Sequence, residues 1–186
     1  IALLDQLSED KPLTLRLYRP PESAPDTLRF KLFHRGTAIT LSDSLPMLER
    51  MGLQVLEEHP YRVKLPDGTS LWIHDFVLRV LDQIELELDV VGEIFEDAFG
   101  RIFVGTLEND GFNRLVLRAG LDADQVVILR AYARYLQQIN FTLSQAYVER
   151  TLAEHSQITR ALIALFRTRF DPGAADAEAT AAQLVA

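Results

Sequence analysis

The chain has 186 residues, of which 48% are hydrophobic and 25% charged, an ordinary composition for one globular domain or two small ones. Its net charge of −8 repels phosphate backbones and anionic lipid, so neither nucleic acid nor a membrane surface is expected as a partner. The absence of cysteine excludes disulfides, thiolate zinc sites and a cysteine nucleophile.

No apolar run reaches the roughly 20 residues that are needed to span a bilayer. The N-terminus, Ile1 to Asp5, also lacks the basic region and cleavage site of a secretory signal. We therefore expect a cytoplasmic protein. The chain does not begin with methionine, which favours a piece of a longer protein.

The N-terminal part has the pattern of short strands around one helix. Alternating apolar residues predict strands at 13–18 and 28–33, separated by a proline-rich connection. A short amphipathic helix should follow, capped by Ser42 or Asp43, with Pro46 in its first turn and Gly52 at its end.

Further extended stretches are predicted at 53–56, 61–65 and 70–76, and the turn at Pro66-Asp67-Gly68 makes the last two a hairpin. The predicted fold class of residues 1–88 is α+β, a small antiparallel sheet with a helix on one face. Regulatory modules of the ACT type share this order of elements, and so do unrelated domains.

From residue 89 to 172 the spacing of apolar residues predicts an all-α module. One stripe contains Phe95, Ala98, Phe99 and Ile102, and a second runs from Phe112 to Gly120. The tail at 173–186 is alanine-rich and is expected to be a loose helix or disordered.

The next helix is expected to begin at a cap formed by Asp122 or Asp124. Its inward-facing residues are predicted to be Ile128, Tyr132, Tyr135, Leu136 and Ile139. The residues predicted to face water are Arg130, Arg134 and Gln137.

A last helical pattern continues through Val148, Leu152, His155, Leu162 and Phe166. We expect it to break near His155, with Ser156 capping the second piece.

No nucleotide-binding loop is expected in this chain. Gly100 and Gly105 have the spacing of a P-loop, but Thr106 and Leu107 stand where lysine and serine or threonine are required. The dinucleotide glycine pattern is missing as well, so we expect no cofactor in this chain.

No metal site is expected either. The histidines never fall three or four residues apart; they are His34, His59, His74 and His155. The acidic stretch from Asp82 to Asp97 alternates with apolar residues, which is typical of a solvated face rather than a calcium loop.

His74 and Asp75 could form an acid–base pair, because a carboxylate can orient an imidazole. Adjacent residues of a strand point to opposite faces, however, so we expect the two side chains not to meet. No catalytic residue is therefore predicted. A small autonomous enzyme that uses this pair or the acidic stretch is kept as an alternative function.

Arginines are the candidates for binding an effector or forming an interface. Arg118, Arg130 and Arg134 could form an anion site across two helices, and Arg35-Gly36 at a strand end could contact an effector carboxylate. The alternative is that these arginines are solvated or paired with the abundant acidic residues.

Several longer strings resemble the large bacterial NAD-specific glutamate dehydrogenases. They lie at 45–53, 72–76, 108–121, 129–136 and 169–172, in the family's order. The resemblance covers about residues 13 to 172. Two departures are Ser156, where the family often has proline, and the alanine-rich end.

The resemblance implies a non-catalytic regulatory or assembly segment, an ACT-like module followed by a helical module, upstream of a dehydrogenase domain. That domain would convert L-glutamate, NAD and water to 2-oxoglutarate, ammonia and NADH. NAD would bind only to the parent enzyme. Expected partners are other domains of the same polypeptide, further copies in a homo-oligomer and an amino-acid effector. A ligand-free adaptor domain is a further alternative.

Overall fold

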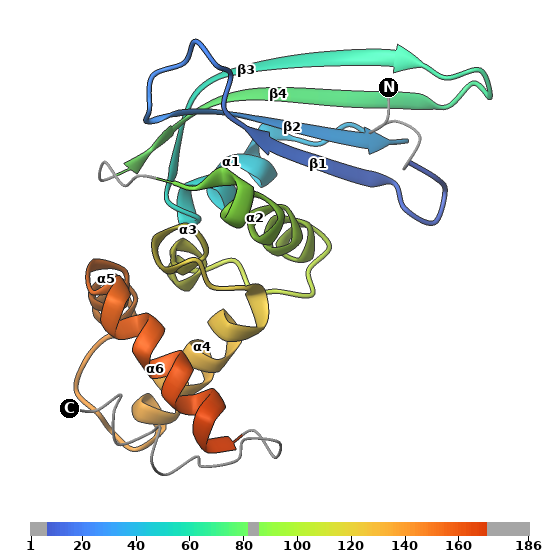
Figure 1. Cartoon of the computed structure of the whole chain (residues 1–186). Helices are drawn as coiled ribbons and strands as arrows, with labels where there is room; N and C mark the ends of the chain where they lie inside the picture. The colour runs from blue at the N-terminus through green and yellow to red at the C-terminus, as the bar shows by residue number, and fades with distance from the viewer. Residues whose placement is uncertain (1–6, 82–85, 171–186) are drawn as a thin grey trace.

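The computed structural model describes residues 7–81 and 86–170, with a sheet on one side and helices packed beneath it (Figure 1). The elements in chain order are β1 (Leu13–Tyr18), β2 (Thr27–Arg35), α1 (Leu41–Arg50), β3 (Leu53–Lys64), β4 (Ser70–Val80), α2 (Leu88–Phe103), η3 (Gly111–Arg114), α3 (Leu115–Ala119), α4 (Ala123–Gln138), α5 (Gln145–Glu154) and α6 (Ser156–Phe170). The predicted fold class is confirmed, an α+β part followed by an all-α part. The predicted tail at 173–186 and part of the acidic stretch lie outside the described residues.

The four strands form one antiparallel sheet in the order β1-β2-β4-β3. The hairpin predicted around Asp67 is confirmed, because it joins β3 to β4. The two predicted stretches at 53–56 and 61–65 are a single strand, which continues through Pro60 and has a bulge between Val55 and Glu57. Proline is tolerated here because β3 is an edge strand.

The predicted start of α1 was wrong by two to three residues. Thr40 occupies the N-cap position, and its hydroxyl donates to Asp43 at 2.5 Å. Ser42 and Asp43 are therefore inside the helix, and Pro46 lies beyond the first turn. The chain leaves the helix at Gly52 as predicted, where φ is +87° and glycine avoids the strain of a side chain.

The core lies between the sheet and α2. The ring of Phe30 on β2 contacts Phe95 at 5.4 Å and Phe99 at 4.9 Å between centroids, and all three side chains are fully buried. The predicted stripe of α2 is thus confirmed. The same apolar cluster continues into the helices through Phe112 and Leu115. The domain boundary after residue 88 stays a prediction.

The orientation predicted for α4 was wrong for Arg130 and for three of the residues expected to face inward, whereas Arg134 and Gln137 are exposed as predicted. Its buried residues are Ala123, Val126, Leu129, Arg130 and Ala133. Tyr132, Tyr135 and Ile139 are exposed instead. The helix carries two apolar faces, and a buried salt bridge of Arg130 selects the face that points inward.

The helix boundaries of the C-terminal part agree with the sequence in most respects. Asp122 caps α4 in a capping box with Gln125, and Gly120 ends α3 with φ of +62°. The chain breaks at His155, which is exposed at the C-terminus of α5. Ser156 is the first residue of α6 rather than its cap. Among the described residues, none of the helices combines the length and hydropathy required to cross a membrane.

Candidate functional site

The loop before η3 is held by its own side chains. The carboxylate of Asp110 accepts the backbone N–H of Phe112 at 3.1 Å, which caps the 3-10 turn. The side chain of Asn113 is fully buried and donates to the carbonyl of Glu108 at 2.8 Å. The short run from Glu108 to Asn113 is therefore folded tightly.

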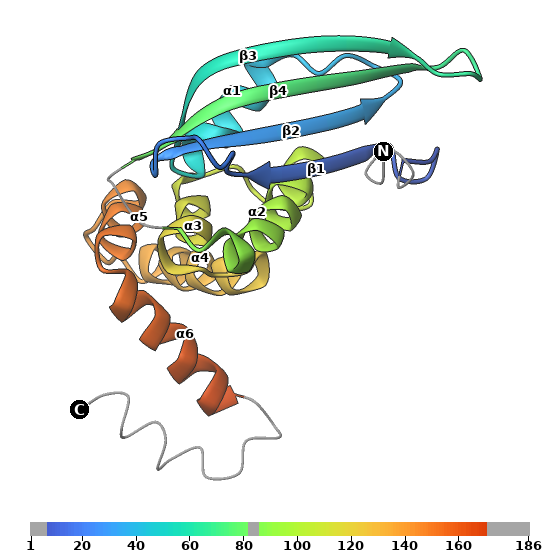
Figure 2. The same cartoon turned by 45° about the horizontal axis from the view of Figure 1, so that its top comes forward.

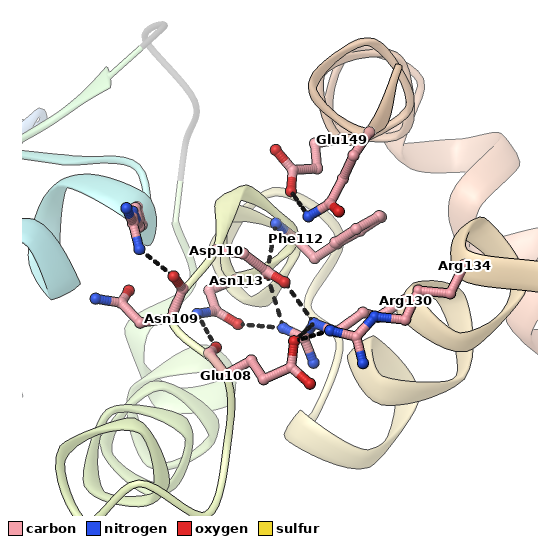
Figure 3. A network of polar contacts seen from close by, with 10 residues as sticks. Glu108, Asn109, Asp110, Phe112, Asn113, Arg130, Arg134 and Glu149 are labelled. Carbon is pink, nitrogen blue, oxygen red and sulfur yellow. Dashed lines mark hydrogen bonds and ion pairs between the residues drawn. The ribbon is translucent and has the colours of Figure 1, made fainter. Parts of the chain in front are cut away.

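Arg130 of α4 inserts into this loop (Figure 3). Its Nε and Nη2 donate to the two carboxylate oxygens of Asp110 at 2.7 and 2.9 Å, and Nη2 also donates to Asn113 Oδ1 at 2.9 Å. The guanidinium lies over the Phe112 ring at 5.8 Å. Only 3% of Arg130 is exposed, so this bidentate pair neutralises a buried charge.

Arg134 extends the network to the surface, where it forms an ion pair with Glu108 (Figure 3). Glu108 also lies 3.9 Å from Nε of Arg130. Both partners of the outer pair are about half exposed, so its contribution to stability is small.

The network also joins neighbouring helices. Arg50 of α1 donates to the carbonyl of Asn109. Within α5, Gln145 donates to Glu149 at 2.8 Å, and Glu149 packs so close to Gly111 that a Cβ there would clash with its carboxylate. The junction, which is the loop from Glu108 to Asn113 with Arg130 and Arg134, is therefore hydrogen-bonded to α1 and packed against α5.

A pocket of about 400 Å³ opens beside this junction. The lining residues include Thr106, Glu108, Arg134, Tyr135 and Gln138. Its outer ion pair offers one carboxylate and one guanidinium, which are the groups that hold the two charges of a zwitterion. Within residues 7–81 and 86–170, no cluster of His, Asp or Glu could hold a metal ion.

The structure brings Arg130 and Arg134 together but not Arg118. Arg118 lies near Glu154 of α5, and burial lowers its pKa below the ordinary value while Glu154 opposes that shift. The role of these three arginines in binding an effector or forming an interface stays a prediction.

Arg35 and Gly36 lie at the end of β2, where the sheet supplies their partners. Arg35 forms an ion pair with Asp67 in the β3–β4 turn. The pKa of Asp67 is below its ordinary value, mainly because the backbone N–H of Thr69 donates to its carboxylate. The carbonyl of Gly36 accepts the indole N–H of Trp72 at 3.2 Å. Their role in effector binding also stays a prediction.

His74 and Asp75 do not pair with each other. His74 Nδ1 lies 2.8 Å from Glu58, whereas Asp75 contacts Arg29 at 3.0 Å and Lys31 at 3.7 Å. The two side chains point to opposite faces of the sheet, as their adjacent positions on a strand require. Both residues are buried.

The remaining candidates lie apart from this junction. His34 contacts the carbonyl of Thr37, and His59 contacts Glu57. Gly100 lies inside α2 and Gly105 just after its end. These positions form no shared site with the junction.

Sequence reasoning missed the roles of Asp110 and Asn113. Both stand in the string at 108–121 that resembles the dehydrogenase signature, which was the available signal. Their role as hydrogen-bond acceptors of Arg130 could not be predicted, because that arginine was assigned to the solvent-facing side of its helix.

Both the sheet and the helices match known protein families. Residues 12–91 match the ACT3 domain of glutamate dehydrogenase, and residues 107–172 match its helical motif 3. The chain is 49% identical over 169 residues to the NAD-specific glutamate dehydrogenase of Halomonas elongata, which covers 91% of the chain. It is 44% identical over 164 residues to that of Pseudomonas aeruginosa, covering 88% of the chain.

A third relative, the NAD-specific glutamate dehydrogenase of Mycobacterium tuberculosis, is 39% identical over 197 residues and covers 100% of the chain. The chain spans only 10% of the length of the first two relatives and 12% of the third. The two family matches follow one another along most of the sequence, in the order in which the sheet and the helices occur. The chain therefore belongs to the glutamate dehydrogenase family, as a segment that contains its ACT3 domain and helical motif 3.

Proposed function

We propose that this chain is a non-catalytic assembly and regulatory segment of an NAD-specific glutamate dehydrogenase. The parent enzyme would convert L-glutamate, NAD and water to 2-oxoglutarate, ammonia and NADH, with NAD bound elsewhere in the polypeptide. The observation that carries the proposal is the network around Arg130, which holds the loop at Asp110 and Asn113 within the helical motif. Arg50 of the ACT3 part donates to the carbonyl of Asn109 in the same loop and so ties the two matched parts together.

The chemistry of the junction supports a structural role. A general base must be free to accept a proton from a substrate. The carboxylate of Asp110 instead receives two guanidinium N–H groups and one backbone N–H. These three bonds occupy most of the roughly four acceptor sites of the carboxylate.

The test is an assay of the isolated chain for glutamate-dependent formation of NADH. We expect no turnover at saturating glutamate and NAD, and no effect of NAD on the melting temperature. Measurable glutamate oxidation by this chain alone would contradict the non-catalytic role and revive the small-enzyme alternative.

The pocket beside the junction supports amino-acid regulation. The α-carboxylate of an amino acid would bind Arg134 and its ammonium group Glu108, replacing the surface ion pair between these residues. We expect calorimetry against a panel of amino acids and nucleotides to give heat with an amino acid, and the heat to disappear in Arg134→Gln.

Arg150→Gln is the matched control, because Arg150 also forms an exposed ion pair, with Glu154 on α5. Heat that survives in Arg134→Gln would place the effector elsewhere. No heat at millimolar concentrations of any compound would leave a ligand-free adaptor role.

Assembly is the second half of the proposal. β1 and β3 are the two edges of the sheet, and an edge strand can pair with another chain or module. We expect a cytoplasmic homo-oligomer whose other contacts come from further domains of the polypeptide. Light scattering of the parent enzyme with and without this segment tests the point, and an unchanged mass would contradict it.

A further inference from the structure

The outer face of α4 carries an open apolar stripe. Ile128, Tyr132, Tyr135 and Ile139 recur at the spacing of one helix face, a pattern that predicts burial. Tyr132 is nevertheless 47% exposed and Tyr135 57% exposed. A continuous apolar surface of this kind is typical of a binding site.

A second stripe follows α6. Thr159 and Ile163 are the buried residues of this 15-residue helix. Ile158, Leu162 and Leu165 stand at positions i, i+4 and i+7, and the first two are exposed. In Figure 2 α6 projects below the other helices, while Phe166 in its C-terminal half contacts Tyr132 of α4. The helix thus offers an apolar face that its own neighbours leave uncovered.

The two stripes meet in an apolar groove of about 600 Å³ between α4 and α6. The Tyr132 ring packs edge-on against Phe166 at 6.0 Å, and Phe166 contacts Phe170 at 4.9 Å. Ile128 and Leu162 are further lining residues. Apolar anchors at helical spacing along a groove are the features that receive an amphipathic helix.

Arg169 lines this groove, and the helix that carries it is basic, although the whole chain has a net charge of −8. α6 contains Arg160, Arg167 and Arg169 and no acidic residue. Arg167 pairs with Asp122 at 3.4 Å, whereas Arg160 and Arg169 are exposed and have no carboxylate partner within the described ranges. A second copy would bring the same basic α6, so a helix with acidic flanks is the better electrostatic match.

We infer that the groove between α4 and α6 binds an acidic-flanked amphipathic helix from another part of the same polypeptide. This inference rests on the proposed function. In each relative, the matched region is only 10% or 12% of one polypeptide. A helix from the rest of such a polypeptide would be covalently attached to the groove that it binds. Attachment gives such a helix a high effective concentration, which a separate protein lacks.

Photo-crosslinking in the full-length dehydrogenase tests the inference. The photoreactive residue p-benzoylphenylalanine replaces Tyr132, and in a control protein it replaces Val104, which is also exposed, at the end of α2. We expect Tyr132 to cross-link within one polypeptide to a single segment that has an apolar stripe and acidic flanks. Val104 should not label that segment.

The inference is overturned if Tyr132 gives no cross-link, links to a second copy, or labels the same peptides as Val104. A second measurement covers a failed labelling reaction. Leu162→Glu should leave the melting temperature of the isolated chain unchanged, because Leu162 is exposed there. It should lower that of the full-length enzyme, because docking of the partner helix would bury the new carboxylate.

Val104→Glu is the matched control, because Val104 is also exposed, at the end of α2. An equal fall for Leu162→Glu in both proteins would show that the groove is already closed in this chain. The proposed function fails on a different result, glutamate oxidation by the isolated chain, so the two failures can be told apart.

Discussion

The sheet half and the helical half of this molecule bury their large side chains to different degrees. In the sheet half, which comprises β1–β4 with α1 and α2, Phe30, Phe76, Phe95 and Phe99 are fully buried in one cluster. In the helical half, α3–α6 with η3, most of the aromatic residues of α4 to α6 are exposed. The large aromatic residues of the first half are enclosed in a core that also includes Phe112 and Leu115 of the second. The second half is organised around a polar junction and keeps an apolar outer surface.

The difference has a physical origin. A sheet covered by a helix removes a broad face from water, and burial of each aromatic side chain there contributes several kcal/mol. Short helices such as α5 and α6 depend on tertiary packing, because isolated helices of this length are marginal in water. Their exposed face therefore favours completion by a further partner.

The largest expected effect comes from Phe30→Ala. This change removes the ring that contacts Phe95 and Phe99, so the free energy of unfolding should fall by about 3–5 kcal/mol. Phe166→Ala, in the open groove, should cost the isolated chain roughly 1 kcal/mol or less. Urea unfolding followed by circular dichroism measures both. Equal losses would abolish the distinction between a closed and an open half.

The junction should show the next largest effect. Arg130→Met removes the guanidinium partner of Asp110 and leaves this mostly buried carboxylate unpaired. We therefore expect a loss of about 2–3 kcal/mol in the free energy of unfolding. The control Arg134→Met breaks a half-exposed pair and should cost less than about 1 kcal/mol. If the two variants lose the same stability in urea, the buried pair does not organise the helical half.

The sequence predicts the sheet half well, for reasons visible in particular residues. The alternation of apolar residues at 13–18 and 28–33 and the turn at Asp67 are local signals. The structure has strands and a hairpin at these positions. The start of α1 was misplaced because Thr40, Ser42 and Asp43 are all acceptable caps. Backbone geometry, rather than residue type, decides among them.

The helical half was predicted less completely, because a long-range contact determines its orientation. α4 has enough apolar residues for two inward faces, and the rule that arginine faces water selected the wrong one. Arg130 is buried because Asp110 and Asn113, far away in sequence, provide its hydrogen bonds. Only the string around residues 108–121 indicated that this loop was special.

Helix capping should produce a smaller effect and can sharpen the contrast within the helical half. Asp122→Ala removes the hydrogen bond that Asp122 accepts from the Gln125 N–H at 2.8 Å and should cost about 1 kcal/mol. Ser144→Ala removes a longer bond of 3.3 Å to the Tyr147 N–H at the exposed start of α5, and should cost less. Thermal unfolding of both variants is the measurement. A larger loss for Ser144→Ala would contradict the expectation that the longer, exposed hydrogen bond contributes less to stability.

The smallest expected effect is a pH dependence confined to the sheet half. Burial raises the pKa of Glu96 above its ordinary value of 4.5, although the Leu17 N–H donates to it at 2.7 Å and Arg16 lies near. The native protein therefore binds this proton more tightly than the unfolded chain does.

The resulting stabilisation is present below pH 4.5 and is lost as the pH rises through the folded pKa. Glu96→Gln keeps an oxygen acceptor for Leu17 and cannot ionise. Its free energy of unfolding, relative to the parent, should therefore increase as the pH rises above 4.5. Urea titrations at a series of pH values measure this difference, with Asp97→Asn on the exposed side of α2 as the control. Parallel curves for Glu96→Gln and the parent would show that Glu96 is solvated, and that the closed half admits water at its β1 edge.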